Sequence, residues 1–235
     1  MATIQSIINR VSFVTKDLSN VRWSLPELAL WLNEAKDLIV AVSSRAAADY
    51  YVLTLKEGPQ QDLRDAIPDK AWIMLFELVC NVDTANGVDT PTGSTIRRVD
   101  RAALDDSYRT WRSQPPTATE VREYTQDARH AYAFTVRPPV AAGTKVYALA
   151  AAQPPACAIL NSAGDALADP NETFPLAPGF DGPAVDYVLY RAFSKDVNDP
   201  ASAGRAQTHF QAFQSFVSAE SGVYAATSVA TGSAK

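Results

Sequence analysis

The side chains best suited to chemistry are few in this sequence: two histidines, His130 and His209, and two cysteines, Cys80 and Cys157. A catalytic nucleophile needs a nearby base, and a metal ion needs several ligands at fixed spacing. None of the patterns G-x-S-x-G, G-x-x-x-x-G-K-[ST], G-x-G-x-x-G, H-E-x-x-H or C-x-x-C occurs. We therefore expect packing or surface histidines, buried thiols, no cofactor, and no catalytic, cofactor-binding or metal-binding residues.

One acidic stretch invites a test as a calcium loop, because Asp83, Asn86, Gly87 and Asp89 lie close together. Aligning the glycine with that of an EF-hand places Val82 where the first carboxylate ligand must stand. The sequence therefore predicts a turn over residues 83–93 rather than a cation site.

A second charged stretch could grip phosphates through its arginines or form ion pairs within the protein. An ion-pair network fits an acidic protein better, and adjacent aspartates in a charge-dense helix are typical of a solvated face. The residues expected in this network are Arg97, Arg98, Asp100, Arg101, Asp105 and Asp106.

The composition predicts a folded chain with an acidic balance. Of 235 residues, 47% are hydrophobic, and 21 basic residues face 26 acidic ones, for a formal net charge of -5. This apolar content is enough for a core, while the lack of basic surplus disfavours sequence-independent DNA binding. No apolar run approaches the roughly 20 residues of a membrane span, and residues 1–10 lack a signal-peptide core. We expect a cytoplasmic protein with no membrane association.

Helices are predicted at the start of the chain. Ile4, Ile7, Ile8, Val11 and Val14 repeat at three and four residues, which predicts a short helix ending near residues 16–20. A longer amphipathic helix is predicted over residues 25–45. Ser24 and Glu27 have the spacing of a capping box at its start, with Trp23 and Leu28 as a hydrophobic staple.

The middle of the chain is predicted to be mainly β. Residues 50–56 are rich in β-branched and aromatic side chains, and residues 71–82 form an apolar run that also favours a strand. Alternation over residues 132–136 and 144–152, with a turn between, predicts a β-hairpin. Residues 97–111 are expected to form a helix that stops before Pro115.

The last third is predicted to hold a proline-rich loop over residues 153–182 and two helices broken at Asp199-Pro200. Residues 221–235 are small and polar apart from Tyr224, so we expect an extended tail. The fold class is α+β: a helical bundle from both chain ends with a β-rich insertion, in a single domain over residues 1–220. Its expected helical parts are 3–48, 97–112 and 183–220, and its β-rich parts are 50–82 and 118–152. The expected core includes Leu32, Ile39, Val188, Leu189, Phe210 and Phe213.

Four separated blocks resemble the head-to-tail adaptors, or connectors, of tailed phages. Their order and spacing along most of the chain carry the resemblance, while residues 60–82 and those after 220 fall outside the blocks. The blocks are 23–28 (WSLPEL) with 31–35 (WLNEA), 94–101 (STIRRVDR) with 104–105 (LD), 134–140 (FTVRPPV), and 185–196 (VDYVLYRAFSKD) followed by 203–206 (AGRA) and 209–210 (HF).

The resemblance implies a structural virion protein, made in the host cytoplasm, that is not an enzyme. It implies a homo-oligomeric ring, dodecameric to match the portal protein above it, with a tail or nozzle protein below and DNA passing through the lumen without specific binding. The tail, through Ser221, Val223 and Tyr224, is expected to contact the portal. The block residues expected between subunits are Arg97, Arg98, Asp100, Arg191, Lys195 and Asp196.

Two other function classes remain open from the sequence. One is an enzyme with an unrecognised site, which the missing chemical constellations disfavour. The other is a monomeric carbohydrate- or protein-binding module using exposed aromatics such as Tyr124, Tyr132 and Tyr147. Tyrosines in strands are more often half-buried sheet residues. A ring observed by negative-stain imaging would support only the adaptor hypothesis.

Overall fold

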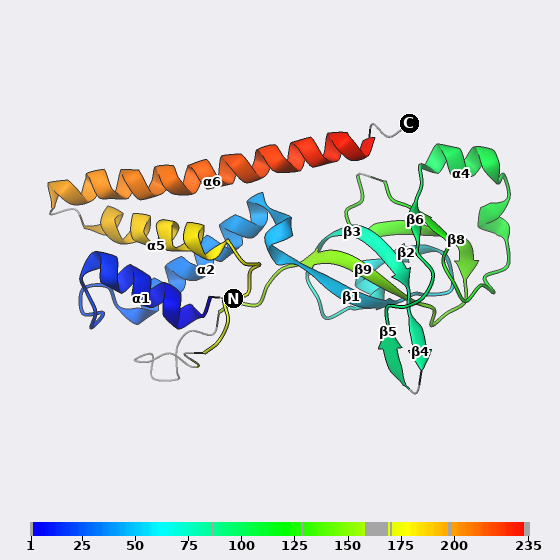
Figure 1. The fold of residues 1–235 in the computed structure, drawn as a ribbon, viewed down its shortest axis with the longest axis horizontal. Coiled ribbons are helices and arrows are strands. Elements are labelled where there is room, and N and C mark those ends of the chain that lie inside the picture. The colour runs from blue at the N-terminus through cyan, green and yellow to red at the C-terminus, as the bar shows by residue number, and fades with distance from the viewer. Residues whose placement is uncertain are drawn as a thin grey trace. The chain divides into compact units, whose positions relative to one another are not determined.

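The computed structural model of the chain describes residues 2–85, 87–127, 129–157, 169, 171–196 and 199–232 (Figure 1). The α+β class is confirmed. The expected single domain is instead two compact units, Met1–Ala47 with Pro154–Lys235, and Ala48–Gln153. We name them the helical unit and the β unit, and describe each by itself.

The helical unit joins helices from both ends of the chain. Its elements are α1 (Ile4–Thr15), α2 (Leu25–Val42), a 3-10 turn (Ser44–Ala47), α5 (Asp181–Lys195) and α6 (Pro200–Gly232). α5 contacts α1, α2 and α6, and its apolar face is buried among them. The predicted core residues Leu32, Ile39, Val188, Leu189 and Phe213 are buried, whereas Phe210 is half-buried and lies 4.8 Å from the Tyr190 ring.

The start of α2 differs in detail from the predicted capping box. The Ser24 hydroxyl caps no backbone group, and it donates to the Glu27 carboxylate at 3.4 Å. Trp23 and Leu28 are both buried, as the expected staple requires. Both apolar residues are therefore buried at this helix start, but the reciprocal hydrogen bonds of a capping box are not formed.

The extended tail predicted from residue 221 is wrong for the described residues, because α6 continues as a helix to Gly232. Alanine is the strongest helix former, and the stretch after Pro200 is alanine-rich with no further proline. Ring contacts show that α5 and α6 are antiparallel, since Phe193 meets His209, Tyr187 meets Phe213, and Phe180 meets Phe216. Phe180 immediately precedes α5, so residues 221–232 extend past the end of that helix.

The β unit contains two main sheets. Sheet one has the order β1-β9-β3, sheet two the order β2-β8-β7-β6, and β4 pairs with β5 in a small hairpin. Their bounds are β1 (Ala48–Thr54), β2 (Gly58–Asp62), β3 (Trp72–Asn81), β4 (Asp83–Ala85), β5 (Val88–Thr90), β6 (Arg97–Arg98), β7 (Glu123–Thr125), β8 (Ala133–Val140) and β9 (Lys145–Ala152). One core cluster, including Leu53, Phe134 and Val146, draws on both sheets.

The hairpin predicted over residues 132–152 is wrong in its pairing, although both strands exist. β8 pairs with β2 and β7, while β9 pairs with β1 and β3. The connecting turn is held by other segments: Gly143 N–H donates to the Leu55 carbonyl at 3.0 Å, and Ala141 N–H donates to the Ala118 carbonyl at 2.8 Å. The chain therefore leaves one sheet and enters the other at this turn.

Two further expectations need correction in the β unit. The turn expected over residues 83–93 contains the β4-β5 hairpin. The helix expected from Arg97 begins only at Arg101, because Arg97 N–H and Val99 N–H donate to the carbonyls of Arg122 and Tyr124 and so hold a short strand. Helical structure follows as α4 (Arg101–Ser107) and a 3-10 turn (Trp111–Ser113), and a short α3 (Leu63–Ala66) follows β2.

The proline-rich segment holds no helix or strand before Asp181 in its described residues, 153–157, 169 and 171–180. α2 side chains fasten its beginning. The buried Lys36 ammonium donates to the carbonyls of Pro154 and Pro155 at 3.3 and 3.0 Å, and Cys157 N–H donates to Asn33 Oδ1 at 2.9 Å. The remainder of the expected loop lies outside the described residues.

Candidate functional site

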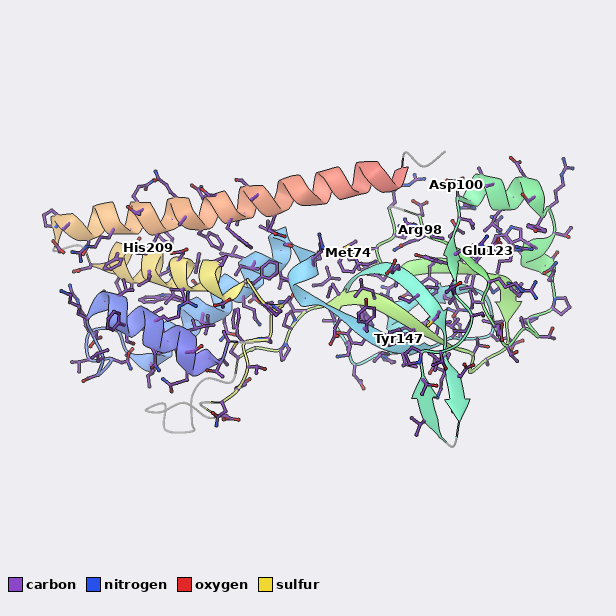
Figure 2. The ribbon with its side chains drawn as sticks, viewed as in Figure 1. Met74, Arg98, Asp100, Glu123, Tyr147 and His209 are labelled. Carbon is purple, nitrogen blue, oxygen red and sulfur yellow. The ribbon has the colours of Figure 1, made fainter. Side chains whose placement is uncertain are left out.

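The chemically active side chains are dispersed in the structure. His209 lies on α6, 2.9 Å from Asp186 of α5, and stacks on Phe193 (Figure 2). Cys80 and Cys157 are buried free thiols, as expected, and burial raises the pKa of Cys157 to about 11. Within the described parts of the chain, no three His, Cys, Asp or Glu residues lie together as a metal site. The two thiols are therefore packed in the interior, and the His209 ring packs against Phe193.

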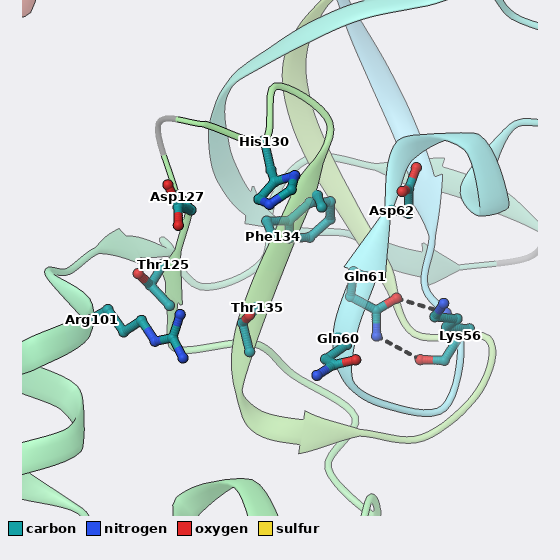
Figure 3. A pocket seen from close by; sticks show the side chains of 11 residues that line it. Lys56, Gln60, Gln61, Asp62, Arg101, Thr125, Asp127, His130, Phe134 and Thr135 are labelled. Carbon is teal, nitrogen blue, oxygen red and sulfur yellow. Dashed lines mark hydrogen bonds between the residues drawn. The ribbon is translucent and has the colours of Figure 1, made fainter.

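A polar pocket of about 350 Å³ opens on the β unit, beside β2 and β8 (Figure 3). Asp62 and Asp127 line it, but each carboxylate bonds to a neighbouring arginine, Arg64 or Arg129. The pKa of Asp62 is lowered chiefly by the Arg64 side chain, and that of Asp127 chiefly by the Arg129 backbone N–H. Carboxylates held ionised in this way are poor proton donors at neutral pH.

Gln61 and His130 also line the pocket. Gln61 is tied to the backbone of Lys56 by hydrogen bonds of 3.0 and 2.8 Å, as the dashed lines in Figure 3 show. His130 is exposed. The pocket is thus lined mainly by polar side chains, and among these described residues no hydrogen bond joins a hydroxyl to His130 or to a carboxylate.

The C-terminal block residues all meet partners within the helical unit. Arg191 Nη1 lies 3.0 Å from Glu34 Oε2 of α2, and Lys195 pairs with Glu27. Asp196 pairs with Arg22 and accepts a hydrogen bond from the Ser202 hydroxyl at 2.9 Å. These pairs hold α5 antiparallel to α2. Their expected role between subunits stays a prediction.

The central block lies on the β unit and behaves differently. Asp100 caps α4 by accepting from Ala102 N–H at 2.7 Å. Arg97 and Arg98 are exposed on β6, and in the described part of the chain neither joins a salt bridge (Figure 2).

The ion-pair network expected around these arginines forms only in part. Arg101 approaches Asp105 at 3.9 Å, while Asp105 bonds more closely to Arg112, at 2.7 Å, and to the Trp111 indole N–H at 3.0 Å. Sequence reasoning missed Arg122, whose carbonyl accepts from Arg97 N–H at 3.0 Å. Arg122 lies beside Arg97 because β6 pairs with β7, and no pattern in the sequence around Arg122 predicts this pairing.

Two remaining groups of candidate residues have simple outcomes. Ser221, Val223 and Tyr224 lie on the backbone of α6, and their side chains are outside the described residues. Of the tyrosines considered for a binding module, Tyr124 is buried, while Tyr132 and Tyr147 are half-buried, as expected for sheet residues.

Comparison with known proteins settles the family. The model of the SU10 adaptor protein family matches residues 2–232, which includes both units and the stretches outside the four blocks. The chain belongs to the SU10 adaptor protein family. This is a family of phage head-to-tail adaptors, so the resemblance seen in the sequence is confirmed.

Membership of the SU10 adaptor family implies an adaptor role in a phage and a place in the virion. No curated protein matches the chain. Among the described helices, none is both long and apolar enough to cross a membrane. The family thus suggests a structural role rather than an enzymatic one.

Proposed function

We propose that this SU10 adaptor assembles into a dodecameric ring beneath the portal protein and joins the capsid to the tail or nozzle protein below. The observation that carries the proposal is the family match over residues 2–232, because it embraces both units rather than one module. The helices of both chain ends act as one bundle, and the β unit is an insertion within it. The protein performs no catalytic step.

DNA crosses the lumen of this ring without specific binding. The chain carries a net charge of -5, so a ring of many copies has a strongly negative field on average. A negative wall repels a phosphate backbone and lets it slide, whereas retention of DNA needs clustered cations. The electrostatic balance of the chain thus favours a conduit over a DNA-binding protein.

The end of α6 is the portal contact in this proposal. Residues 221–232 extend past the start of α5 and include Val223 and Tyr224. Glu220, at the near end of this overhang, accepts from the Ser43 hydroxyl at 3.0 Å, just after α2 ends. Residues 221–232 would bind the portal in this proposal, and repetition of the contact around a ring would add multivalency.

The test of the ring is the mass and symmetry of the purified protein, alone and mixed with its portal. Native mass spectrometry and negative-stain imaging should show a closed ring in at least the portal mixture. A monomer in both samples would contradict the proposal and favour a monomeric binding module.

The portal contact needs a separate measurement. Deleting residues 221–235 should leave ring formation intact and weaken portal binding, measured by co-sedimentation of preformed rings with portal. Rings of the truncated protein that bind the portal as tightly as the full chain would remove α6 from the contact.

A further inference from the structure

The positive charge of this acidic chain is concentrated in one stretch. Residues 97–137 contain eight arginines and no lysine, against six acidic residues. The rest of the chain contains thirteen basic and twenty acidic residues. The stretch therefore has a net charge of +2 and the remainder of -7, and the whole stretch lies within the β unit.

Three of these arginines are close to one another along the paired backbone, and we name Arg97, Arg98 and Arg122 the arginine patch. Arg97 and Arg98 form β6, the edge strand of its sheet, and Arg97 N–H donates to the Arg122 carbonyl at 3.0 Å. All three residues are exposed. As far as the structure describes the chain, none of the three forms a salt bridge.

Two other arginines of the same stretch, Arg112 and Arg137, are neutralised within the chain, whereas Arg109, like the patch, joins no salt bridge among the described residues. Arg112 makes two hydrogen bonds to the Asp105 carboxylate, at 2.7 and 2.9 Å. Arg137 pairs with Glu123, and its guanidinium carbon lies 3.4 Å from the centroid of the Tyr108 ring. A guanidinium already held by a carboxylate attracts an outside anion weakly. The arginine patch keeps its full charge for a partner.

The arginine patch is suited to an anionic partner. The charge of the chain indicates whether that partner is nucleic acid or another copy of the chain. Guanidinium forks bind carboxylates and phosphates in two-point contacts. The net charge of -7 on the rest of the chain repels phosphate and so disfavours nucleic acid as this partner. Another copy of the chain offers exposed carboxylates that join no salt bridge among the described residues, such as Glu57, Asp69 and Asp106.

The symmetry of a ring also favours another copy of the chain as the partner of the arginine patch. A closed ring of more than two identical copies is built from heterologous contacts, in which one surface patch meets a different patch of the next copy. A basic patch on an otherwise acidic chain is self-complementary in this head-to-tail sense. Charge complementarity of this kind also accelerates association and fixes orientation.

We propose that the arginine patch is one half of the contact between neighbouring copies and binds exposed carboxylates of the next copy. The inference rests on the ring of the proposed function and adds to it the face of the subunit that makes the contact. It also gives Arg97 and Arg98 of the central block a role between subunits, whereas the charged residues of the C-terminal block already have partners within the chain.

The test reverses the patch charge and measures assembly. In the variant Arg97→Glu/Arg98→Glu, ring formation is followed by analytical ultracentrifugation across protein concentrations, with and without portal. We expect the half-assembly concentration to rise at least about tenfold. The matched control is Arg64→Glu/Arg129→Glu, which makes the same charge change at exposed arginines that pair locally with Asp62 and Asp127. Circular dichroism checks that both variants are folded.

A mixing experiment tests the head-to-tail geometry. The reversed variant keeps its carboxylates, so it can accept a wild-type arginine patch but cannot offer its own. Added to wild-type protein, it should terminate growing assemblies and lower the ring yield in proportion to its share. The control variant should leave the yield unchanged.

The outcomes separate this inference from the ring itself. If wild-type protein forms no ring with or without portal, the proposed function fails and the inference with it. Wild-type rings beside equally stable rings of the patch variant would overturn the inference alone. The inference is also wrong if the patch variant forms normal rings but loses binding to duplex DNA, because the patch would then hold phosphates.

Discussion

In the helical unit the charged residues of the C-terminal block meet carboxylates or cations of α2 and its approach, whereas in the β unit Arg97 and Arg98 meet none within the described chain. Both sets of residues belong to blocks that carry the family resemblance. The difference teaches that a recognisable block is not by itself an interface. Its charges have first to be followed to their partners in the chain.

The two units also differ in how they use buried polar groups. In the helical unit, Lys36 reaches outward from α2 to fasten the segment that follows the β unit in sequence. In the β unit, Asn81 at the end of β3 binds the segment that precedes β7: its amide donates to the Val121 carbonyl at 2.7 Å and accepts from Val121 N–H at 2.8 Å. Lys36 thus binds a loop that follows the β unit in sequence, whereas Asn81 binds a neighbouring segment within the β unit.

The largest expected effect comes from removing a large side chain from each core. Phe213→Ala in the helical unit and Phe134→Ala in the β unit should each lower the free energy of unfolding by about 3–5 kcal/mol, because both rings are buried. Hydrogen exchange measured by mass spectrometry should show faster exchange in the unit that carries the substitution. The half-buried Phe210→Ala is the control and should cost less. Equal deprotection of both units would show that they unfold together.

Removing a buried polar group should lower the free energy of unfolding by a smaller amount. The loss should be smaller in the helical unit than in the β unit. Asn81→Ala orphans both backbone groups of Val121 and should cost about 2–4 kcal/mol. Lys36→Met should cost less, since the apolar stem is kept and removing a buried charge offsets the lost hydrogen bonds. Chemical denaturation gives both values. A larger loss for Lys36→Met would reverse the comparison.

Local patterns predicted the helical unit better than the β unit. The three-four spacing of apolar residues located α1, α2 and α5, because a helix face is set by residues near one another in sequence. Alternation located β8 and β9 but could not name their partners, and the turn between them turned out to join two sheets. Pairing is a long-range property, so the expected hairpin failed.

The long-range nature of strand pairing also explains why the sequence predicted only part of the arginine patch. Arg97 and Arg98 were visible as a basic pair in the sequence, but Arg122 joins them only through the parallel pairing of β6 and β7. The length of α6 failed for another reason: small and polar residues suggested an unstructured tail, while the alanines among them favour a helix. Composition alone did not show whether the small and polar residues or the alanines would decide the structure of residues 221–232.

Acid sensitivity of the helical unit should depend on Asp17, between α1 and α2. Its carboxylate accepts from the N–H groups of Val21, Arg22 and Trp23 at 2.8–2.9 Å. Desolvation acts to raise its pKa, but these three hydrogen bonds prevail and leave the pKa lowered. A lowered pKa stabilises the fold above the unfolded-state pKa of about 3.9, and this contribution is lost as the pH falls through the folded-state pKa.

Asp17→Asn should therefore cost about 1–2 kcal/mol near pH 7, comparable to loss of a helix cap, and should flatten the fall of stability below about pH 4. Asparagine has one acceptor oxygen where the three N–H groups use two. Thermal melts from pH 7 to pH 3 measure this dependence. Asp69→Asn, at an exposed carboxylate with no salt bridge in the described chain, is the control. If the pH dependence of thermal stability is unchanged in Asp17→Asn, Asp17 is not a cause of the acid sensitivity.

The smallest expected effect sharpens the comparison of the two blocks most directly. Arg191→Gln should cost less than about 1 kcal/mol, because Arg191 and Glu34 are each partly exposed and their attraction is screened by solvent. A double-mutant cycle with Glu34→Gln should give a coupling of about 0.3–1 kcal/mol, and ring formation should be normal in all three variants. Arg97→Glu/Arg98→Glu should show the opposite pattern, with little change in the thermal melt and a large loss of assembly. If Arg191→Gln instead prevents ring formation while the subunit stays folded, the C-terminal block does lie between subunits, and its ion pairs with α2 must open or share their charge on assembly.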